Sequence, residues 1–203
     1  DDVESAVESL SGRKPKIISL QPNSLSDIWN DIKVVSRGLD VEQRGLQLIK
    51  TMKDKIQKLN QSVKELPIQT VACIEWIDPL MAAGNWVPAL VELAGGDNLF
   101  GEAGKHSPWM DFKALKDKDP EVIIVMSCGY NISKTIKEMK VLTDHPEWES
   151  LSAVKEERIY LTDGNQYFNR PGPRIIDSLE ILMEILHEGK FDFSHHKSGW
   201  IRL

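Results

Sequence analysis

The hydrophobic positions follow two different patterns along the chain. Up to residue 66 they recur at helical spacing on otherwise polar segments, and beyond it they gather into short apolar runs. The first pattern predicts a short helix over residues 2–10 and a strand over residues 16–20. It also predicts a helix that Ser24 or Ser26 caps and that ends near Val35.

The longest predicted helix begins at Asp40 and ends near Glu65, before Pro67. About 26 residues at about 1.5 Å each give roughly 39 Å, which is long for a helix inside a small globular domain. A coiled-coil strand is the alternative, but fewer than four heptads favour a helix that lies across a domain. Its apolar residues, three or four positions apart, form a narrow stripe: Ile49, Met52, Ile56, Leu59, Val63 and Leu66.

After Pro67 the pattern alternates between strands and helices, which predicts a parallel α/β sheet. The run Glu121–Met126 is apolar and rich in β-branched residues, as expected of a strand buried on both faces. Residues 191–203 are expected to form a tail. The other predicted strands are 70–74 and 158–162, and the predicted helices are 86–94, 111–118, 133–140 and 173–187.

Composition narrows the classes of function. A net charge of −6 argues against a nucleic-acid partner, and the longest apolar runs are far below a membrane span. The first ten residues are acidic rather than basic, so they do not resemble a signal peptide. Cys73 and Cys128 follow or lie in predicted strands and lack CxxC spacing, which favours two buried thiols over a disulfide or a metal pair.

Four segments, in order, resemble one known family. They are Glu75–Phe100, Trp109 within Ser-Pro-Trp, Pro120–Tyr130 and Asp163–Arg174. Together they are similar to the C-terminal lobe of periplasmic substrate-binding proteins of ABC transporters, of the cobalamin-binding branch with a single bridging helix. A helix, a strand and an asparagine loop near residue 23 also repeat the order found near residue 165.

This resemblance implies an α/β fold with two lobes that face each other across a cleft. Residues 67–190 are expected to form a C-terminal lobe with a parallel sheet in three α/β/α layers. Residues 40–66 are expected to form the bridging helix, residues 1–39 the remnant of an otherwise missing N-terminal lobe, and residues 191–203 a tail. Where the family's cobalamin binders carry a glutamate for transporter docking, this chain has Lys113-Ala-Leu-Lys116.

Ligands of parallel sheets bind beyond the carboxyl ends of the strands. The loops at these ends span 75–85, 127–131 and 163–172, and aromatic side chains there suit a large flat ligand. Trp109 matches a ligand position of the family, whereas Trp86 also fits the core and Arg170 also fits a pair with Asp163. The candidate ligand-binding residues are Trp76, Asp78, Trp86, Trp109, Asn165, Tyr167 and Arg170.

Two other kinds of site receive less support. Glu75 and Asp78 have no nucleophile or base beside them in the sequence, and no phosphate-binding or dinucleotide motif occurs, so an enzyme is not expected. Sister families bind metal ions through His and carboxylates, but none of the five histidines lies in the three loops. The pair His195-His196 is interpreted as solvated.

The sequence therefore predicts a non-catalytic, substrate-binding component of an ABC-type uptake system. The expected ligand is a corrinoid such as cobalamin, with no covalently bound cofactor, and a transporter permease is a possible partner. Heme, siderophores and metal ions are alternative ligands on this scaffold. A second alternative is an interaction protein that forms a homodimer through residues 1–66. The resemblance suggests a periplasmic or extracytoplasmic location, with a cytoplasmic one left open.

Overall fold

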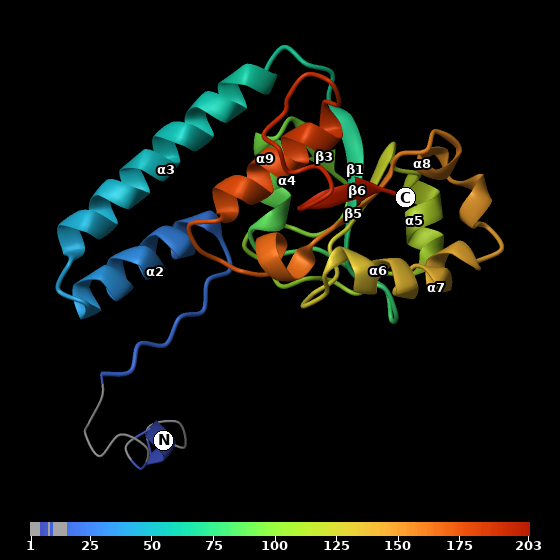
Figure 1. Cartoon of the computed structure of the whole chain (residues 1–203). Coiled ribbons are helices and arrows are strands. Elements are labelled where there is room, and N and C mark those ends of the chain that lie inside the picture. Colours follow the sequence, from blue (N-terminus) through green and yellow to red (C-terminus); the bar gives the residue numbers. More distant parts are fainter. Residues whose placement is uncertain (1–4, 8, 10–15) are drawn as a thin grey trace.

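The computed structural model describes residues 5–7, 9 and 16–203, and it shows a mixed sheet between two helical layers (Figure 1). The sheet order is β2-β1-β4-β5-β6, and β3 pairs with the first half of β1. β1, β3, β4 and β5 are parallel, whereas β2 and β6 run antiparallel at the two edges. The strands are β1 (Gln69–Trp76), β2 (Met81–Ala82), β3 (Gly96–Asn98), β4 (Val122–Val125), β5 (Ile159–Thr162) and β6 (Trp200–Arg202).

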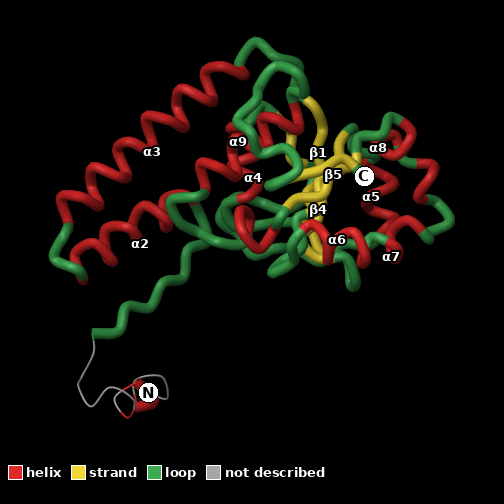
Figure 2. The backbone as a smooth tube through the Cα atoms, viewed as in Figure 1, coloured by secondary structure: helices red, strands yellow, loops and turns green. Residues whose placement is uncertain are grey.

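The helices cover both faces of the sheet (Figure 2). Alternate strand residues point to opposite sides, so Ile124 packs against the layer of α3, α4 and α9, whereas Ile123 packs against α5 to α8. The predicted three-layer α/β lobe is thus confirmed. The helices are α2 (Leu25–Gly38), α3 (Glu42–Val63), α4 (Val87–Leu93), α5 (Phe112–Lys118), α6 (Ile132–Glu138), α7 (Lys140–Thr143), α8 (Ser152–Lys155) and α9 (Ile175–Leu186).

Helices α2 and α3 lie side by side and extend away from the sheet (Figure 1). Ser24, one of the two predicted N-caps, forms a reciprocal capping box with Asp27 at the start of α2, and the helix ends at Gly38 rather than near Val35. The long helix is confirmed but begins later than expected, because Asp40 has a left-handed φ of 56° and Val41 is the N-cap. Its 22 residues give about 33 Å.

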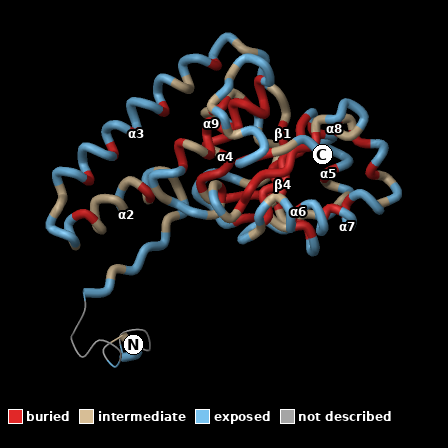
Figure 3. Tube along the Cα trace, viewed as in Figure 1, coloured by how far each residue is buried: buried red, intermediate tan, exposed pale blue. Residues whose placement is uncertain are grey.

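The buried stripe of α3 is narrow, as the spacing predicts (Figure 3). Met52 and Ile56 belong to the core around α9, while the rest of the helix surface is largely exposed. The Asn60 side chain donates to the carbonyl of Leu93 at 2.9 Å and so joins α3 to the end of α4. Among the described residues, no helix is long and apolar enough to cross a membrane.

Three expectations about secondary structure need correction or fall outside the description. Residues 16–20 form no strand, since Ile17 and Leu20 are exposed and lie on no sheet. Residues 191–203 are no free tail, because β6 pairs with β5 and Trp200 is buried. The short strand β3 directly follows the predicted Gly95 helix end and was not expected. Most of the helix expected over residues 2–10 lies outside the described residues.

Candidate functional site

The three predicted loops meet at the carboxyl edge of the sheet. The amide of Cys128 donates to the carbonyl of Glu75 at 3.0 Å, and the amide of Asn165 donates to the carbonyl of Tyr130 at 3.1 Å. These two bonds connect the loops that follow β1, β4 and β5. The loops therefore form one continuous surface, as the parallel topology requires.

Two tryptophans stand on this surface in a ladder that crosses β2. Trp76 at the end of β1 pairs with Met81, and Met81 forms an antiparallel bridge with Trp109. Met81 thus joins Trp76 and Trp109 in one ribbon, and the register of β1 and β2 shifts between Ile74 and Trp76. The flanking backbone bonds, from Ala82 to Pro108 and from Met110 to Leu80, hold the ribbon in place. Trp109 keeps 64% of its surface exposed.

Tyr130 adds a third aromatic side chain that the list of candidates lacked. Its ring centroid lies 5.3 Å from that of Trp76, and the Lys134 ammonium lies 3.6 Å from the Tyr130 centroid. The Trp76 indole donates to the carbonyl of Asp78 at 2.9 Å, which leaves the Asp78 carboxylate exposed. A small cavity of about 40 Å³ is lined by Trp76, Asp78 and Tyr130. The buried hydroxyl of Ser127 beside it has no hydrogen-bond partner among the described residues.

Trp86 lies between the core and a second, larger cavity. It is only 8% exposed, packs in the core, and donates its indole N–H to the carbonyl of Phe168 at 3.2 Å. The cavity of about 170 Å³ is lined by Trp86 together with Glu75, Cys128 and Asn169. The predicted ambiguity of Trp86 thus has a physical basis, because the same ring serves the core and borders the cavity.

This larger cavity is rich in hydrogen-bond acceptors. One oxygen of Glu75 accepts from the Ser107 hydroxyl at 2.7 Å, and that hydroxyl accepts from the Gly84 amide at 3.1 Å. Within the described part of the chain, the side-chain oxygen of Asn169 is buried without a hydrogen-bond partner. Neither Glu75 nor Asn169 was among the candidate ligand residues. The position of the Glu75 carboxylate depends on distant Ser107, which no local motif indicates.

The cysteines differ from the expectation of two buried thiols. Cys73 is buried, and burial together with Glu75 raises its pKa to about 12. Cys128 is exposed at the cavity rim. Burial and the Glu75 carboxylate raise the pKa of Cys128, while Arg170 opposes them. Both thiols are free and stay protonated at neutral pH.

The predicted ligand residues of the last strand-end loop, residues 163–172, point in two different directions. Arg170 is exposed and donates to Asn165 twice, at 3.1 Å to the carbonyl and 2.9 Å to the side-chain oxygen, and not to Asp163. The Tyr167 ring lies 5.9 Å from His195 of the C-terminal segment. Burial, followed by Asp177 and Asp163, raises the pKa of Tyr167. The structure thus gathers Trp76, Asp78, Trp86, Trp109, Asn165 and Arg170 along the strand ends and turns Tyr167 toward α9.

Known proteins with similar sequences and folds were compared with this chain. It is 24% identical over 176 residues to the Vitamin B12-binding protein of Vibrio vulnificus (strain CMCP6), which covers 83% of this chain and 59% of that protein. It is 21% identical over 173 residues to an uncharacterized ABC transporter substrate-binding lipoprotein of Bacillus subtilis (strain 168), of which it covers 52%. The chain therefore spans less than two thirds of the length of these relatives.

Solved structures give the same picture of the fold. An ABC transporter substrate-binding protein from Listeria monocytogenes EGD-e superimposes with a TM-score of 0.75 at 18% identity over 92% of this chain and 74% of that one. S. aureus IsdE complexed with heme gives 0.73 at 16% identity over 92% and 73%. Residues 3–166 match the family model described as periplasmic binding protein, and the chain belongs to this family.

Proposed function

We propose that this chain is the C-terminal, ligand-binding lobe of the substrate-binding component of an ABC-type uptake system, and that it binds a corrinoid without catalysis. The observation that carries the proposal is the aromatic ladder of Trp76 and Trp109 at the strand ends. Two indoles on segments joined through Met81, with Tyr130 beside Trp76, offer apolar surface to a large planar ligand. Relatives named as vitamin B12-binding proteins support the same choice.

The acceptor-rich cavity beside the ladder bears on the choice of ligand. Glu75 carries a negative charge toward Cys128, and Asn169 presents an unpaired oxygen. A ligand whose rim carries amide N–H groups, as a corrinoid does, satisfies such acceptors. A heme instead presents carboxylates, which the Glu75 charge repels. The heme complex of a structural neighbour keeps heme as the alternative ligand, with siderophores and metal ions after it.

In this proposal the ligand lies between two lobes. Residues 67–190 form one lobe, residues 40–66 the bridging helix, and residues 1–39 belong to the other lobe. An apolar groove of about 360 Å³ between α2 and α3, whose walls include Leu20, Leu39 and Leu48, is the surface that this second lobe covers. The extracytoplasmic location and the permease partner come from the family and from the lipoprotein relative. A homodimer through this groove is the competing interpretation.

Calorimetric titration with cyanocobalamin and with hemin tests the proposal. We expect cyanocobalamin to bind, and Trp109→Ala to weaken binding about tenfold or more, because exposed tryptophans dominate such contacts. Trp29→Phe is the control, since Trp29 lies on α2 beside Lys53 and lines neither of the two cavities at the strand ends. Binding of hemin alone, or equal affinities of the Trp109→Ala variant and the unchanged protein, argues against a corrinoid site on the ladder.

Glu75→Gln separates the two ligand classes within the same cavity. The substitution removes the negative charge and keeps the size of the side chain. We expect weaker binding of the amide-bearing corrinoid, because an anionic acceptor makes the stronger hydrogen bond. Heme binding is expected to strengthen, because the repulsion of its carboxylates is removed. A stronger corrinoid complex in the variant contradicts the assignment.

A further inference from the structure

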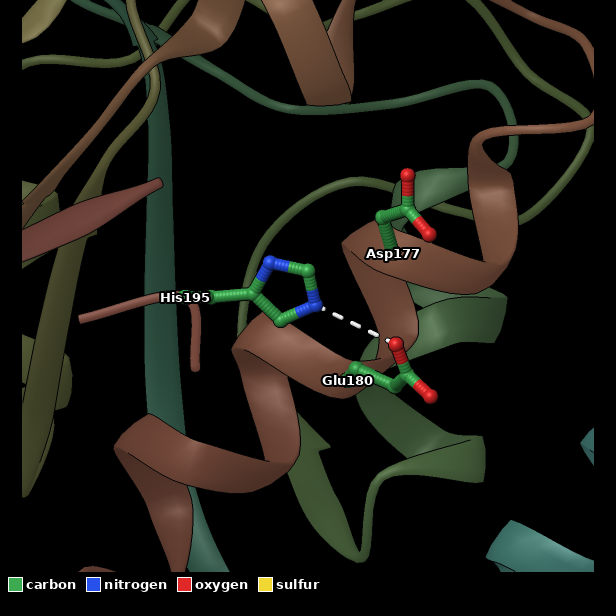
Figure 4. Close-up of side chains that lie close together, drawn as sticks. All are labelled: Asp177, Glu180 and His195. Carbon is green, nitrogen blue, oxygen red and sulfur yellow. Dashed lines mark hydrogen bonds and ion pairs between the residues drawn. The ribbon is translucent and has the colours of Figure 1, made fainter. Parts of the chain in front are cut away.

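A cluster of charged side chains lies where α3, α9 and the C-terminal segment meet, apart from the three strand-end loops. Its centre is Glu180, which is buried on α9. One of its oxygens lies 2.7 Å from the Lys55 ammonium of α3, and the other lies 3.1 Å from Nε2 of His195 (Figure 4). His195, interpreted from the sequence as solvated, is therefore part of the folded structure, with only 15% of its side chain exposed.

Asp177 completes the cluster one helical turn before Glu180. Figure 4 shows the two carboxylates on successive turns of α9 and the His195 ring pointing at the helix. One ligand atom from each of Asp177, Glu180 and His195 lies within 4.8 Å of the other two. The Asp177 carboxylate is partly buried, and no hydrogen bond or ion pair holds it within the described part of the chain. The cluster thus has more negative charge than Lys55 alone neutralises.

We propose that Asp177, Glu180 and His195 bind a divalent cation of the zinc class. One imidazole and two carboxylates form a three-ligand zinc set with a fourth position open to water. The imidazole disfavours Ca²⁺ and Mg²⁺, which take oxygen ligands. Tetrahedral ligands about 2.0–2.2 Å from zinc lie roughly 3.4 Å apart. His195 and Glu180 already meet this spacing at 3.1 Å, and the ligand atoms within the 4.8 Å limit need to approach by at most about 1.4 Å. The spacing of Asp177 and Glu180, three residues apart on one helix, allows this approach.

The ion replaces two interactions in the cluster. The Nε2 proton that bonds to Glu180 leaves, because metal binds the neutral imidazole through a free nitrogen. Lys55 swings into solvent, which its 48% exposed side chain allows. The bound ion then holds the C-terminal segment to α9. Because Tyr167 packs its ring against His195, the site lies directly behind the last strand-end loop.

The alternative is that Lys55, Glu180 and His195 form a purely structural network. Asp177→Asn distinguishes the two, because Asp177 contributes a ligand to the cation site but no hydrogen bond or ion pair to the described protein structure. Lys55→Gln also distinguishes them. It removes an ammonium that competes with the cation for Glu180, so a cation site predicts a higher zinc affinity in this variant. A structural network predicts no change in zinc affinity from either substitution.

The experiment is a calorimetric titration of the metal-free protein with zinc chloride in a weakly coordinating buffer. We expect one ion per chain, an affinity at least tenfold lower in Asp177→Asn and in His195→Ala, and a higher affinity in Lys55→Gln. His196→Ala is the matched control, because this neighbouring imidazole is exposed and its centroid lies 4.7 Å from that of the Trp200 ring, at a tilt of 42°. Circular dichroism checks that each variant is folded.

Two results would overturn the site. One is an absence of saturable zinc binding by the unchanged protein. The other is equal zinc affinity in the unchanged protein and in folded Asp177→Asn. The cyanocobalamin titration is independent of both results, so a failure of the cation site and a failure of the proposed ligand function are distinguishable.

Discussion

Some buried side chains in this protein donate hydrogen bonds to backbone C=O groups of other segments. His187 is buried, and its Nε2 donates to the carbonyl of Ala94 at 2.8 Å, across the end of α4. Trp86 does the same at the strand ends with the carbonyl of Phe168. Such bonds satisfy a buried donor without placing a charge in the core, where an ion is costly. The ionisation of a residue so placed then changes the stability of the fold.

His187 predicts a loss of stability in acid. Burial lowers the pKa of His187 from its ordinary value of 6.5, and Lys190 and Arg158 act in the same direction. Below pH 6.5 the unfolded chain therefore takes up a proton that the native state resists. The free energy of unfolding falls from there until the pH passes the native pKa, by less than about 1.4 kcal/mol per pH unit.

Urea unfolding at pH 7.5 and 5.5 measures this effect. His187→Gln keeps a side-chain donor for Ala94 but does not titrate, so we expect a smaller drop in stability between the two pH values. His187→Ala also loses the drop but is less stable at both values, because the Ala94 carbonyl loses its partner. An unchanged pH dependence in His187→Gln shows that other groups cause the acid loss.

At the scale of elements, hydrophobic periodicity predicted the helices and strands whose burial pattern is visible in their own sequence. The buried stripe of α3 and the strand β4 were predicted because apolar residues recur at helical spacing in α3 and are continuous in β4. The incorrect predictions concern segments whose secondary structure depends on pairing with residues far away in the sequence. Residues 16–20 have strand-like composition but lie on no sheet, whereas β6 has three residues and becomes a strand through β5.

The candidate site was predictable to a similar extent. Parallel topology alone placed the three loops together. Trp76 was chosen for residue type, and Trp109 also for its match to a ligand position of the family. Their connection through Met81 depends on β2, a strand of two residues that leaves no periodic signal. The direction of Tyr167 depends on His195 of the C-terminal segment, which was expected to be free. Contacts between segments far apart in the sequence were thus the part that could not be predicted.

Among the described residues, the buried carboxylate of Glu184 makes the most hydrogen bonds between α9 and the C-terminal segment. Glu184 accepts from the backbone amides of Phe193 and His195 and, at 2.6 Å, from the Trp200 indole. We expect Glu184→Gln to destabilise the fold by roughly 2–3 kcal/mol, because the amide nitrogen faces N–H donors in place of an anionic acceptor. Urea unfolding measures the loss, and hydrogen exchange should show β6 opening first.

Glu188→Gln is the control for Glu184, because Glu188 is exposed and forms a surface ion pair with Arg202 of β6. A surface ion pair contributes about 0–1 kcal/mol, so this variant is expected to stay close to the unchanged protein. Equal losses from the two substitutions contradict the assignment of Glu184 as the main attachment of the segment.

At the scale of the whole molecule, the sheet with α9 and the helix pair of α2 and α3 differ in how completely they are packed. The sheet and α9 form a closed core, whereas the groove between α2 and α3 leaves Leu20, Leu39 and Leu48 facing solvent. Exposed apolar patches of this kind mark surfaces that another body covers. The chain matches only part of its relatives' length, and the covering body is, in our proposal, the other lobe.

Leu39→Ser tests whether the groove is open in this chain by itself. Leu39 is 67% exposed, so we expect a change below about 0.5 kcal/mol in the free energy of unfolding and a monomer mass by light scattering. Ile28→Ala in the same groove is the contrast, because Ile28 is buried and its loss costs about 2–5 kcal/mol. A dimer mass that Leu39→Ser converts to monomer identifies a second copy as the cover. If the other lobe is the cover, Leu39→Ser destabilises only a longer chain that carries that lobe, since only there is Leu39 removed from water.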